Sequence, residues 1–213
     1  MKDLIIIGAG GLGREVSWLV EGINEANPEW NILGYVDDAE DVQGAIIGGQ
    51  YPVLGKIEDL KKYAGEVYVS CAIAKPSVRK MIIERVLQQE NLQAATLIHP
   101  SAFIGRGVKI GKGCIITHMC LLSVDVELQD HVFLNTGVVI GHDTVVEEYC
   151  TIMTNTNLAG CIRVGAGTDM GTATRVIPGV KICPNVVTGA GAVVIRDIME
   201  PGTYVGVPVR KAK

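Results

Sequence analysis

The segment LNTGVVIGHDTVVEEYCTIM, residues 134–153, belongs to a six-residue repeat that runs from residue 98 to residue 199. Stepping by six from Ile98 reaches seventeen positions, of which sixteen are apolar and only Thr188 is polar. The fifth position of each six is always Ala, Cys, Val, Thr or Ile, and the second is often Gly. A period this regular predicts a repeat architecture rather than a biased composition.

The six-residue unit fits one short strand and a turn, which is typical of a parallel β-helix. Two residues of each six are expected to point inward, so that stacked coils build a continuous apolar column. The small fifth position indicates where this interior is narrow. The glycines are expected in the turns, where they permit positive φ.

The length of the chain limits the number of domains, and its net charge limits the kinds of partner. The 213 residues are enough for one or two domains. A net charge of −4 without a basic stripe argues against nucleic acid as the main partner. The apolar run after Met1-Lys2-Asp3 is too short for a signal peptide or a membrane span. We therefore expect a cytoplasmic protein with no membrane partner.

The six cysteines form no CxxC pair, and three of them fill the inward fifth position of the repeat: Cys114, Cys120 and Cys150. This placement indicates reduced packing residues, and no metal is expected. Cys161 is a poor candidate for a nucleophile, because no His neighbours it in the sequence.

The N-terminal stretch carries a second motif. The apolar run Leu4 to Ile7 ends in GAGGLG at residues 8–13, and Asp37 and Asp38 follow a predicted strand at residues 31–36. The intervening segment predicts a helix with one apolar face, formed by Val16, Leu19, Val20 and Ile23. A GxGxxG turn between strand and helix, with an acid further on, is the dinucleotide-binding pattern, although glycine turns also close ordinary βα units.

The segments that follow predict half of a doubly wound fold. Residues 56–63 and 77–89 are predicted as helices and residues 67–73 as a strand, so that about four strands precede Leu97. A half-fold suits a mononucleotide better than a dinucleotide. We predict a Rossmann-like domain over residues 1–96 and a β-helix over residues 97–213, capped by the segment after Met199.

Of the four histidines, His142 is the candidate general base. Imidazole groups titrate near neutral pH, and the adjacent Asp143 can orient the ring and stabilise its charged form. One coil is three repeats, so Gly160, eighteen residues further on, is expected beside the ring. His99 is interpreted as structural, and His118 and His131 as solvated surface residues.

Five motifs occur in order along the chain: GAGGLG at 8–13, Asp37-Asp38, LIHPSA at 97–102, Asn135-Thr136 with IGHD at 140–143, and GVP at 206–208. Together they resemble the bacterial sugar O-acyltransferase family, which includes sialic acid O-acetyltransferases and nucleotide-linked amino-sugar N-acetyltransferases. The resemblance implies an α/β, half-Rossmann-like domain that binds a nucleotide sugar, followed by a left-handed β-helix. It also implies a homotrimer, with acetyl-CoA in a groove between neighbouring β-helices.

Residue roles are carried over from this resemblance by position. His142 corresponds to the general base and Asp143 to its acidic partner. Contacts with the nucleotide sugar are implied for Gly10, Gly11, Leu12, Asp37, Asp38, Ala74 and Asn135. Contacts with the coenzyme are implied for Thr151, Gly160, Thr172 and Ala190. Leu12 stands where a His is frequent, and Thr151 where some members have a coenzyme-side His.

The resemblance implies direct acyl transfer, in which His142 takes a proton from the acceptor and the Gly160 N–H meets the oxyanion. The acceptor is expected to be the amine of a nucleotide-linked sugar, with O-acetylation by the same mechanism as the alternative. A γ-type carbonic anhydrase needs a close His pair, whereas His131 and His142 are eleven residues apart. A non-catalytic β-helix scaffold is the remaining alternative. The motifs leave the nucleotide and the sugar open.

Overall fold

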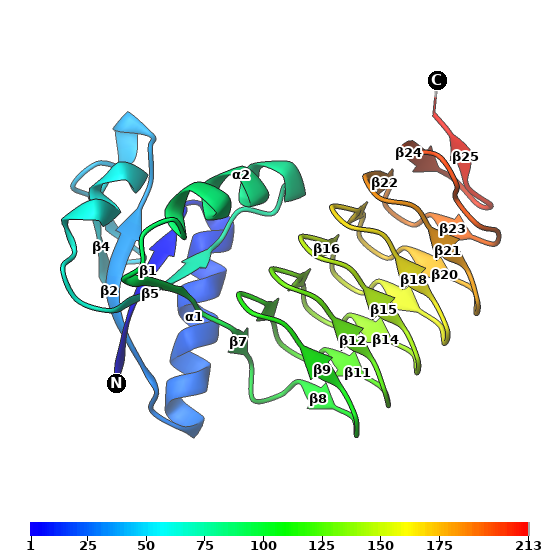
Figure 1. The fold of residues 1–213 in the computed structure, drawn as a ribbon, viewed down its shortest axis with the longest axis horizontal. Helices are drawn as coiled ribbons and strands as arrows, with labels where there is room; N and C mark the ends of the chain where they lie inside the picture. The colour runs from blue at the N-terminus through cyan, green and yellow to red at the C-terminus, as the bar shows by residue number, and fades with distance from the viewer. Residues whose placement is uncertain (213) are drawn as a thin grey trace. The chain divides into compact units, whose positions relative to one another are not determined.

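The computed structural model describes residues 1–212 and divides the chain into two compact units, Met1–Pro100 and Ser101–Lys213. Figure 1 shows the first unit in blue to green and the second in green to red. The division falls after Pro100, slightly beyond the boundary predicted near residue 96.

The first unit is built on a six-stranded sheet of order β3-β4-β2-β1-β5-β6. Its strands pair in parallel except for β3, which pairs antiparallel with β4. The strands are β1 (Lys2–Ile7), β2 (Trp30–Val36), β3 (Ile46–Ile47), β4 (Tyr51–Gly55), β5 (Val67–Cys71) and β6 (Leu92–Ala94). The sequence predicted about four strands; β3 and β6, with two and three residues, are too short to show a period.

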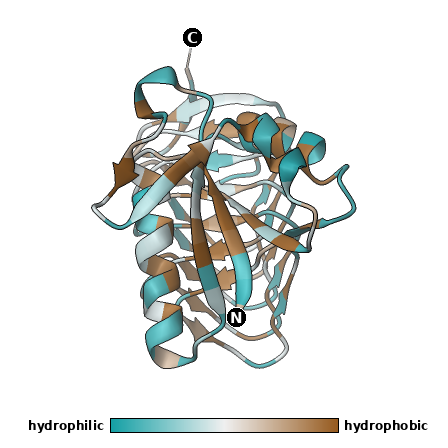
Figure 2. Cartoon of the chain, turned by 90° about the vertical axis from the view of Figure 1, so that its left-hand side faces the viewer, coloured by the Kyte–Doolittle hydropathy of each residue, from teal (hydrophilic) through white to brown (hydrophobic). Residues whose placement is uncertain are grey.

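The helices of this unit are α1 (Gly11–Ala26) and α2 (Pro76–Val86), with the 3-10 helices η1 (Glu40–Val42) and η2 (Ile57–Lys62). The predicted apolar face of α1 is buried, as are residues Leu4 to Ile7 of β1. Figure 2 shows the same pattern: the strands are largely brown, whereas α1 carries both teal and brown. The helix predicted over residues 56–63 forms as the 3-10 helix η2. A short strand β7 (Leu97–Ile98) follows β6.

The second unit is a left-handed parallel β-helix with three walls, visible in Figure 1 as a ladder of coils from β8 to β25. The first wall holds β8 (Phe103–Ile104), β11 (Leu121–Leu122), β14 (Val139–Ile140), β17 (Asn157–Leu158), β20 (Arg175–Val176) and β23 (Val193–Val194). The second holds β9 (Lys109–Ile110), β12 (Glu127–Leu128), β15 (Val145–Val146), β18 (Arg163–Val164) and β21 (Lys181–Ile182). The third holds β10 (Ile115–Ile116), β13 (Phe133–Leu134), β16 (Thr151–Ile152), β19 (Asp169–Met170), β22 (Val186–Thr188), β24 (Gly202–Val205) and β25 (Arg210–Lys211).

The register of the walls is one coil of eighteen residues. Ile140, for example, pairs with Leu158, and Leu128 pairs with Val146. These first-position side chains are buried, and so are fifth-position residues such as Cys150. The predicted apolar column is therefore confirmed. Each large aliphatic side chain buried in it contributes about 1.5–3 kcal/mol relative to exposure.

The second-position glycines do not adopt positive φ and are required for a different reason. A Cβ at Gly141 would lie 2.6 Å from the carbonyl carbon of Ala159, and one at Gly165 would lie 2.4 Å from the nitrogen of Pro184. These glycines are needed because the backbone of the next coil passes too closely for a side chain. Positive φ falls on the fourth position, where turn glycines such as Gly137 (φ 71°) adopt it as predicted, and so do Asp143 (φ 55°) and Cys161 (φ 61°).

The cysteines of the fifth position, Cys114, Cys120 and Cys150, are buried as predicted. Within residues 1–212, neither α1 nor any other helix has the length and apolar character needed to cross a membrane.

Candidate functional site

His142 and Asp143 form the turn between β14 and β15, at the corner that joins the first and second walls. The N–H of Asp143 donates to the carbonyl oxygen of Val124 in the preceding coil at 3.2 Å. The carbonyl oxygen of His142 accepts from the N–H of Cys161 in the following coil at 2.8 Å. Asp143 adopts φ 55°, a conformation that Asp tolerates better than most residues. Backbone hydrogen bonds on both sides therefore fix this turn.

The two side chains form a hydrogen-bonded pair on the surface of the coil. Nδ1 of His142 lies 2.7 Å from Oδ2 of Asp143, and the side chains are 56% and 60% exposed. An ionised carboxylate only accepts hydrogen bonds, so it favours the tautomer with the hydrogen on Nδ1. Nε2 then keeps a lone pair that can take a proton from an acceptor group.

Gly160 lies directly beside the imidazole, as the eighteen-residue coil predicted. A Cβ at this position would lie 2.5 Å from Nε2 and 2.6 Å from Cε1 of His142. Gly160 is buried, and its carbonyl oxygen accepts from the N–H of Gly179 at 3.0 Å. Any larger residue at position 160 would displace the ring.

Cys161 is the neighbour that sequence reasoning missed. A ring nitrogen of His142, a carboxylate oxygen of Asp143 and Sγ of Cys161 all lie within 4.8 Å of one another, and all three residues are exposed. No His neighbours Cys161 along the chain, but in the folded coil His142 lies beside it. The signal was present in the sequence, because Cys161 follows His142 by one coil and one residue.

The residues expected along the coenzyme groove do not lie together. Thr172 and Ala190 are exposed, one coil apart, at the corner between the third and first walls. Asn135 is half-buried at the same corner, where its Oδ1 accepts from the N–H of Thr136 at 2.7 Å. Gly160 lies at the other edge of the first wall, beside His142. Thr151 is fully buried in β16, so its side chain lines no open groove of the single chain.

In the first unit, the GAGGLG turn joins β1 to α1. Gly8 has φ +101°, and a Cβ on Gly13 would lie 2.1 Å from the carbonyl oxygen of Gly8. Gly10 and Gly11 differ, because a Cβ on either would meet no described atom within 4 Å. Gly8 and Gly13 are therefore required by the turn itself. Gly10 and Gly11 leave open space at the N-terminus of α1, and the free N–H groups of a helix N-terminus stabilise an anionic group.

Asp37 and Asp38, which were expected to bind the nucleotide sugar, both have backbone partners in this structure. Asp37 accepts from the N–H groups of Ala9 and Ala39 at 2.8 and 2.9 Å. It thereby ties the glycine turn to the end of β2. Asp38 accepts from the N–H of Ile57 at 2.9 Å, at the start of η2.

Ala74 lies in the connection between β5 and α2, where a buried arginine holds the backbone. Nη1 of Arg79 donates to the carbonyl oxygens of Ile73 and Ala74 at 2.8 and 2.9 Å, and Arg79 is only 2% exposed. Sequence reasoning missed Arg79. Its signal was a charged residue on the buried face of a predicted helix.

The other three histidines agree only in part with their predicted roles. His99 packs against α1, where a Cβ on Gly22 would lie 2.6 Å from its Nε2, which agrees with a structural role. His118 is half-buried. The surface assignment of His131 is wrong: it is 7% exposed and stacks on Tyr149, with ring centroids 5.0 Å apart and an angle of 16°.

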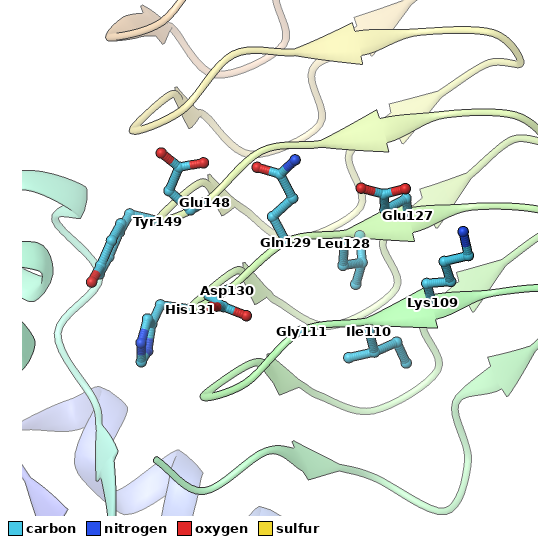
Figure 3. A pocket seen from close by; sticks show the side chains of 10 residues that line it. All are labelled: Lys109, Ile110, Gly111, Glu127, Leu128, Gln129, Asp130, His131, Glu148 and Tyr149. Atoms are coloured by element: carbon cyan, nitrogen blue, oxygen red, sulfur yellow. The ribbon is translucent and has the colours of Figure 1, made fainter. Parts of the chain in front are cut away.

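An open hollow of about 630 Å³ surrounds His131 at the corner between the second and third walls. Figure 3 shows His131 and Tyr149 side by side, with the acidic side chains Glu127, Asp130 and Glu148 on neighbouring coils. His142 and Asp143 lie at a different corner. The hollow is therefore not part of the His142 site.

Residues 3–86 match the family model of the PglD N-terminal domain. These residues lie within the first unit, which is therefore similar to that domain. A curated relative, UDP-N-acetylbacillosamine N-acetyltransferase of Bacillus subtilis (strain 168), is 30% identical over 120 residues. That alignment covers 54% of this chain and 51% of the relative, so it spans about half the relative's length.

Solved structures match the chain over its full length. The acetyltransferase domain of PglB from Neisseria gonorrhoeae FA1090 superposes with a TM-score of 0.89 at 25% identity, covering 100% of both chains. A histidine variant of perosamine N-acetyltransferase from Caulobacter crescentus, in complex with CoA and GDP-perosamine, also gives a TM-score of 0.89 at 27% identity. This superposition covers 100% of the present chain and 98% of the perosamine N-acetyltransferase chain. The family resemblance and the fold predicted from the motifs are confirmed.

Proposed function

We propose that this chain is an acetyl-CoA-dependent N-acetyltransferase that acts on the amino group of a nucleotide-linked sugar. The observation that carries the proposal is the exposed His142–Asp143 pair, with its 2.7 Å contact, on a β-helix that follows a unit similar to the PglD N-terminal domain. The named relatives favour nitrogen over oxygen as the acceptor. One of them was solved with acetyl coenzyme A, and another with CoA and GDP-perosamine.

The reaction uses His142 as a base without a covalent enzyme intermediate. The acceptor amine loses its ammonium proton to solvent and then attacks the thioester carbonyl of acetyl-CoA. After the attack, the nitrogen gives one proton to Nε2 of His142, and Asp143 stabilises the imidazolium through Nδ1. The tetrahedral intermediate then collapses: its C–S bond breaks, and the coenzyme A thiolate leaves and takes the proton from the imidazolium. A backbone N–H, which we assign to Gly160, is the proposed donor to the oxyanion.

Two ligand sites are proposed on the two units. The open space beside Gly10 and Gly11, together with Leu12 and the connection at Ala74, would hold the nucleotide. Asn135 would meet the sugar. The exposed corner with Thr172 and Ala190 carries small side chains, which leave room for the extended chain of coenzyme A.

A panel of nucleotide-linked amino sugars tests this function. With acetyl-CoA, one member should give release of free coenzyme A and a product heavier by one acetyl group. The same sugar nucleotide should raise the melting temperature of the protein, because a ligand that binds only the folded state stabilises it. Acetylation of a sugar hydroxyl, with no reaction at any amine, would favour the O-acetyl alternative. Absence of stabilisation by coenzyme A would favour the scaffold.

The first prediction concerns assembly. The outward side of the first wall exposes large apolar side chains, Phe103 at 67% and Leu121 at 38%. His142 lies at one edge of this wall, and Thr172 and Ala190 lie at the other. Cyclic packing through the first wall would therefore bring the base of one copy to the coenzyme corner of the next.

We expect light scattering to give a mass three times the 22.7 kDa of one chain. Phe103→Glu should shift this mass toward the monomer, and it should weaken acetyl-CoA binding in parallel. Lys109→Glu, on the neighbouring wall, is the matched control and should leave the mass unchanged. A wild-type monomer at micromolar concentration would contradict the groove between copies.

The second prediction separates the two acids after β2. Asp37→Ala removes the partner of the Ala9 N–H and should loosen the glycine turn. Charged hydrogen bonds contribute about 1.5–3 kcal/mol, so we expect the KM for the nucleotide sugar to rise about tenfold or more. Acetyl-CoA affinity should stay unchanged.

Asp38→Ala is the control, because its partner is at η2; it should lower stability with a smaller change in KM. A fall in coenzyme affinity in Asp37→Ala would instead place the coenzyme's nucleotide on the first unit.

A further inference from the structure

The corner that carries His142 also carries a thiol that the proposed reaction does not use. Cys161 is exposed, and its backbone N–H donates to the carbonyl oxygen of His142 at 2.8 Å. The same coil contact therefore fixes the backbones of the proposed base and of the cysteine against each other. Sγ is free of any disulfide.

Three ligand types converge at this corner. A nitrogen of His142, an oxygen of Asp143 and Sγ of Cys161 lie within 4.8 Å of one another. Across residues 1–212, no other group of three such side chains meets this spacing. Ligands of a tetrahedral zinc ion lie about 3.3–3.8 Å apart, because its bonds are about 2.0–2.3 Å long. Small rotations of the exposed side chains can bring Sγ of Cys161 closer, and they can also lengthen the 2.7 Å contact between His142 and Asp143 to a ligand spacing.

We propose that His142, Asp143 and Cys161 form a binding site for a divalent transition-metal ion, best suited to Zn²⁺, and that the bound ion inhibits the enzyme. Imidazole nitrogen, thiolate sulfur and carboxylate oxygen are the three protein ligands that zinc takes. Magnesium and calcium prefer ligand sets made of oxygen alone. Three protein ligands leave a fourth position for water.

The inhibition follows from what the ion does to His142. A coordinated ring nitrogen no longer offers its lone pair to a proton. If Nδ1 binds the ion, the ring hydrogen lies on Nε2, so Nε2 has no free lone pair either. This half of the proposal rests on the proposed function, whereas metal binding itself does not. The ion is an inhibitor that occupies the catalytic pair, and not a cofactor.

Metal binding is tested on the full-length, metal-free protein by titration with Zn²⁺ against a competing chelator. We expect one ion per chain. Cys161→Ser should weaken binding by more than the ~10–100-fold typical of losing an outer-shell partner. Cys183→Ser is the matched control, because Cys183 is partly buried and lies outside the cluster; it should bind as wild type does. Co²⁺ as a spectroscopic probe should show a thiolate-to-metal charge-transfer band in wild type and Cys183→Ser only. Equal Zn²⁺ affinity in wild type and Cys161→Ser would overturn the site.

Inhibition is tested in the acetyl-transfer assay. Metal-free Cys161→Ser should transfer acetyl groups at the wild-type rate. Zn²⁺ should inhibit wild type and Cys183→Ser at the concentration that fills the site, and Cys161→Ser only at concentrations higher by about tenfold or more. Inhibition that is equal in all three proteins, or absent from an active wild type, would overturn the inhibitory role. A protein that binds Zn²⁺ through Cys161 but transfers no acetyl group would refute the proposed function and leave the metal site standing.

Discussion

Replacing His142 with Ala is expected to lower kcat by about 10²–10⁴-fold, the range typical of removing a positioned general base. KM should change little, because the imidazole acts on the proton that moves during the reaction rather than on the bound ground state. The fold should survive, since the side chain is 56% exposed and points away from the column. Steady-state kinetics and a melting curve on the same preparation measure both effects.

Two further variants sharpen this test. Asp143→Asn should cost less, because an amide oxygen can still accept from Nδ1 but no longer favours the charged ring. His118→Ala, at the corner between the third and first walls, should stay near wild-type activity. A His142→Ala enzyme with unimpaired kcat would refute the general base. The alternative would then be that desolvation alone deprotonates the acceptor amine, without a base from the protein.

Gly160→Ala is expected to disable the same base without removing it. The added Cβ would lie 2.5 Å from Nε2 of His142, so the ring must move away from its present position. Misplacing a catalytic group by about 1 Å can cost about 10²-fold in rate, and we expect a fall in kcat of that order. The backbone of Gly160 lies outside the left-handed region, so alanine itself introduces no strain there.

The control for this substitution is Gly65→Ala, because a Cβ at Gly65 meets no described atom within 4 Å. It should leave both kcat and the melting temperature unchanged. In Gly160→Ala, a low kcat with a wild-type melting temperature is the expected result. A wild-type kcat would mean that catalysis does not need the ring against Gly160. A fall in melting temperature that matches the fall in activity would indicate damage to the fold instead.

Most of the β-helix could be predicted from the sequence, because the residues that fill its interior recur at a fixed period. One inward residue at a constant spacing of six leaves a signal that no single strand of two residues could give. The first unit was harder. β1, α1 and β2 are long enough to show their periods, whereas β3 and β6 are held by pairing with neighbours and carry almost no local pattern.

By itself, the sequence determined the length of one coil. It also determined two neighbours of His142. Asp143 is adjacent along the chain, and Gly160 is one coil further on. Only the tertiary structure decided where the side chains at the corners point. It placed Cys161 beside His142, stacked His131 on Tyr149 at an open hollow, and gave Asp37 a backbone partner at Ala9. The physical reason is that repeat spacing fixes which backbones meet, whereas rotamers and turn dihedrals, set by neighbouring coils and connections, fix which side chains meet.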